Sequence, residues 1–184
     1  MPITQILERN AALYGEEVSL VEINPEIKEV KASWKDYELV ETNPEKKYRR
    51  EMTWREFDDK ANRFANFLLG RGLQKGQKVA ILLMNCLEWL PIYFGILKTG
   101  ALAVPLNYRY TEDEITYCLD LAECEVLIFG PEFTERIDAI RGRIPNIKIR
   151  LFLGQDCPVF AESYYALTAC CSSVGPKIAL SDDD

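Results

Sequence analysis

Between residues 53 and 153 the sequence alternates between short apolar runs of strand length and longer segments with helical spacing, and this alternation strongly constrains the fold. The strand-like runs are residues 78–83, 101–105, 125–129 and 147–153, and the helical segments are residues 53–70, 87–98, 111–122 and 132–143. Apolar strands joined by single helices indicate a parallel sheet with right-handed crossovers. The sequence therefore predicts an α/β fold: an open, mostly parallel sheet with helices on both faces.

Two helix starts carry a capping box, in which a Thr is followed three residues later by a Glu; these are Thr53 and Thr111. Gly70 and Gly72 end the helix at 53–70. Asn85 is expected to cap the start of the next helix, at 87–98. The predicted buried face of the helix at 53–70 is Phe57, Ala61, Phe64, Ala65 and Leu68. That of the helix at 111–122 is Ile115, Cys118, Leu119 and Ala122. The predicted exposed face of the first is Arg55, Asp59, Lys60, Asn62 and Arg63.

A small helix and strand segment is predicted to precede this unit. Apolar spacing indicates a helix at residues 3–14 with Thr4 as its N-cap, and alternation indicates a strand at residues 18–23. A turn is expected at residues 24–25, where Asn precedes Pro.

Residues 25–50 are predicted to be an irregular insertion. Within it, residues 33–37 echo residues 53–57 and carry the same capping pattern, so we expect a short surface element there. The basic spot at residues 48–50 is expected to be a solvated loop.

The chain is accordingly divided into three parts, which are residues 1–52, 53–154 and 155–184. In the last part, residues 162–171 are predicted to form one more helix, and residues 172–184 have the composition of a linker.

The charge balance argues against nucleic acid as a partner, because 22 Lys and Arg face 29 Asp and Glu, for a net charge of −7. No apolar stretch is long enough to span a bilayer, and the N-terminus lacks the features of a secretory signal. We therefore expect a cytoplasmic protein with its six cysteines reduced.

The chain contains no His, so it cannot assemble a Ser-His-Asp or Cys-His catalytic arrangement. A zinc site formed by Cys118, Cys124, Cys170 and Cys171 is conceivable, but no Cys-x-x-Cys pair is present and a buried thiol is the better interpretation of Cys118. No catalytic or metal-ligating residue is assigned.

Two places in the sequence are candidates for phosphate binding. The glycines of residues 70–76 follow a helix and precede a strand, which is the reverse of the order in a phosphate-binding loop, so a turn is favoured. Arg109 lies in the turn after the strand at 101–105, at the edge where open α/β sheets bind ligands. Its guanidinium is suited to a phosphate or carboxylate, whereas an ion pair with Glu112 or Asp113 is the structural alternative.

Several segments taken together resemble the AMP-forming acyl-CoA synthetase family. They are MTWREF at 52–57, ANR at 61–63, KVAILLMNCLEW at 78–89, LKTGA at 97–101, VPLNYR at 104–109 and TEDE at 111–114. The resemblance is strong over residues 53–153 and modest over residues 3–23, and residues 25–50 match only as an insertion. Many members have Pro where Tyr108 stands.

The resemblance implies the N-terminal portion of an enzyme of fatty acid metabolism that joins a small-molecule carboxylate to CoA through an acyl-adenylate. ATP, Mg²⁺ and CoA would be cofactors of the parent enzyme, and none is expected to bind tightly to this chain. Arg109 matches an Arg that contacts CoA phosphates in some members. The Ser/Thr/Gly-rich phosphate loop and the C-terminal domain of the family are absent from these 184 residues, so the chain alone is expected to be inactive.

The alternative is a free-standing, non-catalytic α/β module that binds a protein partner or a nucleotide through its exposed sheet edge. In either case an unpaired strand edge or apolar face predicts self-association.

Overall fold

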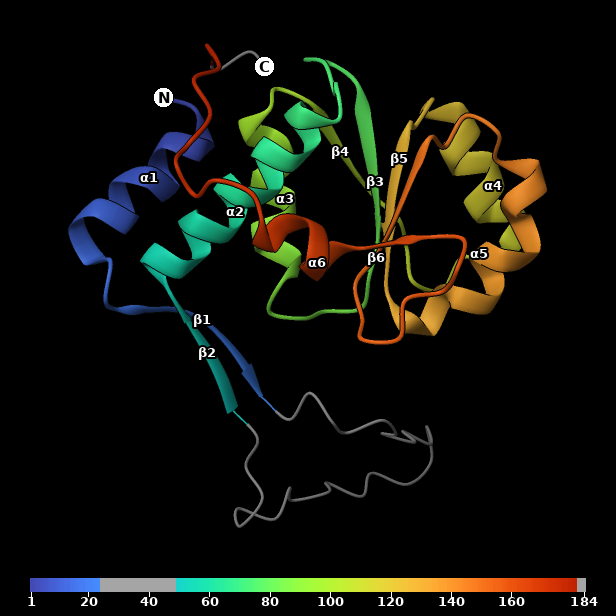
Figure 1. Cartoon of the computed structure of the whole chain (residues 1–184), viewed down its shortest axis with the longest axis horizontal. Helices are drawn as coiled ribbons and strands as arrows, with labels where there is room; N and C mark the ends of the chain where they lie inside the picture. Colours follow the sequence, from blue (N-terminus) through green and yellow to red (C-terminus); the bar gives the residue numbers. More distant parts are fainter. Residues whose placement is uncertain (24–48, 182–184) are drawn as a thin grey trace, which may run out of the picture.

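A sheet of five parallel strands forms the centre of the computed structural model, which describes residues 1–23 and 49–181 (Figure 1). The strand order is β4-β3-β5-β6-β7, and every neighbouring pair is parallel. The strands are β3 Lys78–Leu82, β4 Leu102–Pro105, β5 Val126–Phe129, β6 Ile149–Phe152 and β7 Glu162–Ser163. The four predicted strands are therefore confirmed, and β7 is an addition to them.

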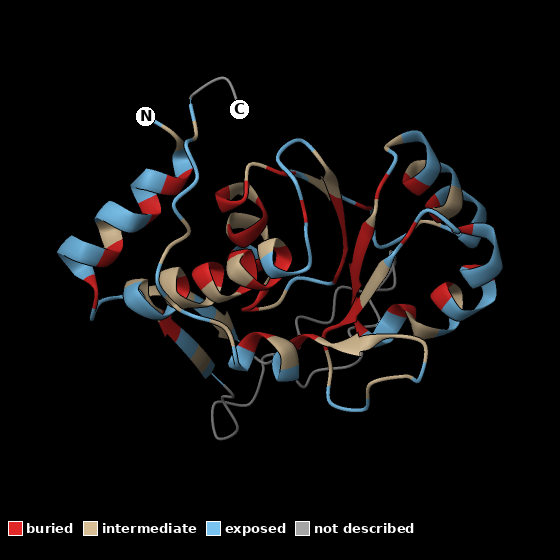
Figure 2. Ribbon diagram, turned by 45° about the horizontal axis from the view of Figure 1, so that its top comes forward, coloured by how far each residue is buried: buried red, intermediate tan, exposed pale blue. Residues whose placement is uncertain are grey.

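Helices cover both faces of this sheet (Figures 1 and 2). The first face carries α2 Trp54–Gly70, α3 Trp89–Lys98 and α6 Tyr164–Ala169, and the second carries α4 Glu112–Leu121 and α5 Thr134–Ile140. The predicted single helix at 132–143 is divided, because the 3₁₀ turns η2 Pro131–Phe133 and η3 Arg141–Arg143 flank α5. The predicted fold class, an open parallel α/β sheet with helices on both faces, is confirmed.

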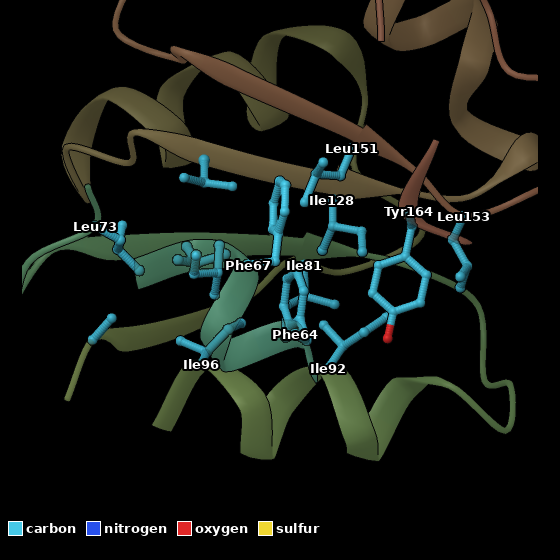
Figure 3. Packing of buried hydrophobic residues seen from close by; sticks show 14 of the residues in the cluster. Phe64, Phe67, Leu73, Ile81, Ile92, Ile96, Ile128, Leu151, Leu153 and Tyr164 are labelled. Atoms are coloured by element: carbon cyan, nitrogen blue, oxygen red, sulfur yellow. The ribbon is translucent and has the colours of Figure 1, made fainter. Parts of the chain in front are cut away.

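Alternating side chains of the central strands build two separate cores. In β3, Val79 and Ile81 pack against Phe64 of α2, whereas Ala80 and Leu82 pack on the side of α4 and α5. Figure 3 shows the first core, with Ile81, Ile128 and Leu151 from three neighbouring strands facing the helices. A strand buried on both faces must be apolar throughout, which is why these strands were recognisable as continuous apolar runs.

The long helix α2 begins at the predicted capping box. The Thr53 hydroxyl accepts from the Glu56 amide at 3.2 Å, and a Glu56 carboxylate oxygen accepts from the Thr53 amide at 2.9 Å. All five residues of its predicted buried face are buried. Asn62, however, was predicted to be exposed and is buried, with its amide nitrogen donating to Asp58 Oδ2 and to the Ser173 carbonyl, each at 2.9 Å.

The segment that Asn62 contacts is not a free linker. Residues 172–181, here called the strap, have no regular secondary structure and run along α2 (Figure 1). The Asn66 amide nitrogen donates to the carbonyls of Ser172 and Val174, both at 2.8 Å. Side chains of α2 thus satisfy backbone carbonyls of the strap. The preceding helix prediction at 162–171 is partly wrong, because Glu162 and Ser163 form β7 and α6 begins only at Tyr164.

The N-terminal part consists of α1 Ile3–Tyr14 and an antiparallel hairpin of β1 Val18–Ile23 with β2 Arg49–Thr53. The predicted helix and strand are confirmed, but Thr4 is not the N-cap: Pro2 holds that position, and Thr4 is a buried residue of the first turn. The end of the basic spot at 48–50 is also not a loop, because Arg49 and Arg50 belong to β2. The turn at 24–25 and the surface element at 33–37 lie outside the described residues.

The apolar helix α3 begins without the predicted cap. Its N-cap position is Glu88, with no side-chain capping hydrogen bond, and Asn85 is exposed three residues earlier. Pro91 lies in the first turn, where a missing amide proton is tolerated. Neither α3 nor any other helix within the described ranges has the length and apolar character needed to cross a membrane.

Candidate functional site

The strand order places a topological switch point between β3 and β5. From β3 the chain passes through α3 to β4 on one side, and from β4 it passes through α4 to β5 on the other side of β3. The carboxyl ends of β3 and β5 therefore lie side by side, with Leu82 paired with Phe129. Open α/β sheets bind ligands outside the carboxyl ends of their strands at such a point, so this edge is the candidate site.

The turn that carries Arg109 leaves this same edge. The Arg109 amide donates to Asn107 Oδ1 at 2.9 Å, and the Tyr110 amide donates to the Asn107 carbonyl at 3.0 Å. The Arg109 side chain is exposed, and its Nε donates to the Tyr108 hydroxyl at 2.9 Å, with Cζ 5.3 Å from the centre of the Tyr108 ring. Tyr108 therefore positions the guanidinium of Arg109.

The predicted structural alternative for Arg109 is an ion pair with Glu112 or Asp113. Asp113 instead pairs with Arg143, whose Nη2 lies 2.6 Å from Asp113 Oδ1. The contacts that the structure gives Arg109 are with Tyr108 and Asn107. Its outer guanidinium nitrogens thus face solvent at the ligand edge, an arrangement compatible with binding a phosphate.

Arg136 of α5 is a second arginine at this turn, and the sequence alone does not reveal it. Its Nη1 donates to the carbonyls of Tyr108 and Tyr110, at 3.0 and 3.1 Å. The Arg136 guanidinium also lies over the Phe133 ring, with Cζ 5.6 Å from its centre. These contacts hold the turn after β4 against α5, the helix that follows β5 on the other side of the switch point. The spacing of apolar residues in a helix does not predict which distant backbone a polar side chain such as Arg136 will contact.

The N-terminus of α4 adjoins the turn but is not suited to bind an anion. Thr111 and Glu114 form the predicted capping box, which is confirmed, and Glu112 and Asp113 add two more carboxylates to the first turn. Hydrogen bonds from the Thr111 amide and hydroxyl hold the pKa of Glu114 below its ordinary value. These three carboxylates offset the positive end of the helix dipole and repel an incoming phosphate.

A buried carboxylate, that of Glu88, lies at the other side of the carboxyl edge, after β3. The side chain of Glu88 is 2% exposed and accepts from Arg50 Nη2 at 2.7 Å, with Lys60 Nζ at 3.8 Å. Arg50 also reaches Glu22 at 3.3 Å, so this ion pair cluster ties the β1-β2 hairpin to the start of α3. A carboxylate held between two cations has a structural role here.

A hollow of about 530 Å³ lies between β1 and the loop after β3, lined mainly by apolar side chains that include Leu20, Ile23, Trp89 and Leu90. Cys86 also lines it. Burial, followed by the charge of Glu88, raises the pKa of the Cys86 thiol to about 11. A thiol of that pKa is protonated near neutral pH and is therefore a poor nucleophile.

The structure separates the cysteines of the conceivable zinc site. Cys118 and Cys124 pack in the core on the α4 side of the sheet, whereas Cys171 packs in the core on the α2 side. All six cysteines are free thiols. The glycines at 70–76 form the predicted turn, with Gly72 and Gly76 at φ values of +85° and +83° between α2 and β3.

The fold and its edge define a doubly wound α/β unit that presents an arginine-bearing turn beside its switch point. The chain matches the family model described as AMP-binding enzyme over residues 28–176, and it belongs to that family.

Two curated relatives illustrate the match. The chain is 37% identical over 92 residues to the long-chain-fatty-acid–CoA ligase FadD13 of Mycobacterium tuberculosis, which covers 50% of this chain and 18% of the relative. It is 32% identical over 98 residues to the medium/long-chain-fatty-acid–CoA/3-oxocholest-4-en-26-oate–CoA ligase of Mycobacterium marinum, covering 53% of this chain and 18% of the relative. The matched region thus spans less than a fifth of each of these relatives.

Solved structures give the same result. The N-terminal domain of FACL13 from Mycobacterium tuberculosis has a TM-score of 0.76 at 25% identity, covering 100% of this chain and 40% of that one. The anthranilate CoA ligase AuaEII in complex with anthranoyl-AMP has a TM-score of 0.75 at 27% identity, covering 94% of this chain and 29% of that one. The chain therefore corresponds to an N-terminal region of acyl-CoA ligases.

Proposed function

We propose that this chain is the N-terminal part of an enzyme that joins a carboxylic acid to CoA at the expense of ATP. The family match over residues 28–176 is the observation that carries the proposal. In such a reaction the carboxylate attacks the α-phosphorus of ATP and releases pyrophosphate. The CoA thiol then attacks the acyl carbon of the adenylate and releases AMP. The relatives named above act on medium- and long-chain fatty acids, so we propose a fatty acid as the substrate.

Within this reaction we assign Arg109 to a phosphate of CoA. Its exposed guanidinium at the carboxyl edge of the sheet supports this assignment, since planar guanidinium donors match phosphate oxygens. ATP and Mg²⁺ would be held elsewhere, because the glycines at 70–76 leave a helix instead of preceding one. We therefore propose that the 184 residues alone do not form an adenylate.

Sequencing the coding DNA beyond the codon for Asp184 tests the parent enzyme. A frame that continues into a Ser/Thr/Gly-rich loop with a Lys supports the ligase. A stop codon at that point favours the alternative, a non-catalytic module that binds a partner. As a direct assay, the purified chain is incubated with a long-chain fatty acid, ATP and Mg²⁺; pyrophosphate release by this polypeptide would contradict the proposed inactivity.

We also propose a cytoplasmic location and self-association. Free thiols at all six cysteines agree with a reducing compartment. For self-association, the supporting observations are the edge strand β4, with Leu102 48% exposed, and the outward apolar side chains Ile3 and Leu13 of α1. Analytical ultracentrifugation tests it, and a monomer at every concentration would contradict it.

A further inference from the structure

The turn at residues 107–110 takes its shape from two local hydrogen bonds and one distant side chain. Asn107 accepts from the amides of Arg109 and Tyr110, which fixes the chain direction within the turn. The remaining constraint comes from Arg136, which lies 26 to 28 residues further along the chain and donates to the two carbonyls on either side of Arg109. The backbone of Arg109 is thus held from both sides by one guanidinium.

Arg136 is poorly placed to bind a phosphate itself. The shallow hollow that it lines, of about 320 Å³, is otherwise lined by Thr111, Glu112 and Asp113. Two carboxylates in that hollow oppose an anion, whereas Arg109 is engaged by neutral groups. One of the outer nitrogens of Arg136 is already committed to the two carbonyls. Its contacts therefore point to an effect on the turn.

The position of the turn matters because the strand before it lies at the edge of the sheet. β4 has β3 as its only sheet neighbour among the described strands, so the sheet supports the start of the turn from one side. α5, which follows β5, supplies the second support through Arg136. A guanidinium anchored on a rotamer-rich side chain binds a phosphate well only when its backbone is fixed.

We infer that Arg136 is a positioning residue for CoA recognition, which holds the Tyr108–Tyr110 backbone so that Arg109 meets a CoA phosphate. This inference rests on the proposed function and adds a residue to it. Arg136 acts through Arg109 and makes no contact with CoA of its own. It therefore predicts coupling between the two arginines.

A double-mutant cycle with CoA as the probe tests this coupling. Arg109→Met, Arg136→Met and the double variant are titrated with CoA, and the dissociation constant is followed by the amide signals of the ¹⁵N-labelled 184-residue chain. We expect each single variant to weaken binding by about ten-fold, and the double variant to match Arg109→Met instead of multiplying the two effects. The amide signals of Arg109 and Tyr110 should also move in Arg136→Met without CoA.

Arg141→Met is the matched control, since it removes the same charge from the adjoining turn η3, where Arg141 pairs with Asp138. Equal weakening by Arg141→Met and Arg136→Met would mean that net charge alone matters and would overturn the inference. So would multiplicative effects in the double variant, or wild-type affinity in Arg136→Met. Wild-type affinity in Arg109→Met would instead overturn the proposed CoA contact itself. If Arg136→Met does not fold, Arg136→Lys takes its place in the cycle.

Discussion

Gly95 lies where α3 crosses α2, and replacing it with Ala tests the packing of the two helices. A Cβ atom at residue 95 would lie 2.9 Å from the Ala61 carbonyl oxygen and 3.0 and 3.1 Å from two carbon atoms of Phe64. The oxygen belongs to the backbone of α2 and cannot rotate away, so the helices must separate. Phe64 is fully buried and has little room to move.

Two opposing contributions decide the outcome. Ala is favoured over Gly within a helix by about 1 kcal/mol. Overpacking of a well-packed core costs about 1–3 kcal/mol, and a clash with a backbone atom belongs at the upper end of that range. We therefore expect Gly95→Ala to lower the free energy of unfolding by about 2 kcal/mol. For a chain of this size that corresponds to a fall in Tm of roughly 4–8 °C.

Urea unfolding followed by far-UV circular dichroism measures the change. Gly70→Ala is the matched control, because it makes the same substitution at the last residue of α2, where nothing lies within 4 Å of the added Cβ. We expect the control to be neutral or up to about 1 kcal/mol more stable. If Gly95→Ala were as stable as Gly70→Ala, the close contact between α2 and α3 would not exist in solution.

Three further predictions concern buried polar groups. Arg50→Ala leaves the buried carboxylate of Glu88 with a single, more distant cation, Lys60. The free energy of unfolding measured by chemical denaturation should therefore fall by about 2–3 kcal/mol. No change would show that the Arg50–Glu88 ion pair is dispensable. Asn62→Ala removes a hydrogen bond to the strap, so hydrogen exchange should speed up within the strap while the sheet keeps its protection; uniform acceleration would contradict a local role. Because burial raises the pKa of the Cys86 thiol from 9.0 to about 11, iodoacetamide at pH 8 should modify Cys86 roughly 100-fold more slowly than a free thiol of pKa 9.0. The rate should climb until the pH passes 11, and equal rates at pH 8 would refute the shift.

The sheet was predictable because its strands are buried on both faces. Residues such as Val79 and Ala80 point to opposite cores, so neither position tolerates a polar side chain and the apolar run is visible in the sequence. The capping boxes at Thr53 and Thr111 were equally visible, because their partners lie only three residues away. Arg109 was placed correctly in the turn at the carboxyl edge of the sheet, and its role there stays a prediction.

Features that depend on distant partners were not predictable. β2 contains two arginines and a glutamate, and it is a strand only because it pairs with β1 across a long intervening segment. Asn62 has the polarity of an exposed residue, but it is buried by a strap that lies 111 residues away in the chain. Arg136 belongs to a predicted helix, and no spacing in that helix shows that its side chain reaches the turn after β4.

Helix α2 packs against α6 and the strap, which are synthesised long after it, and this order affects how the chain folds during synthesis. The Phe64 ring packs against Tyr164, with ring centres 5.3 Å apart. The hydrogen bond from Asn62 to the Ser173 carbonyl forms only after residue 173 has been synthesised. A ribosome adding about 5–20 residues per second takes roughly 5–20 s to make that intervening stretch. Throughout this interval the side of the Phe64 ring that packs against Tyr164 lacks that partner. We therefore expect ribosome-bound intermediates of this chain to be clients of chaperones, and release to follow the emergence of α6.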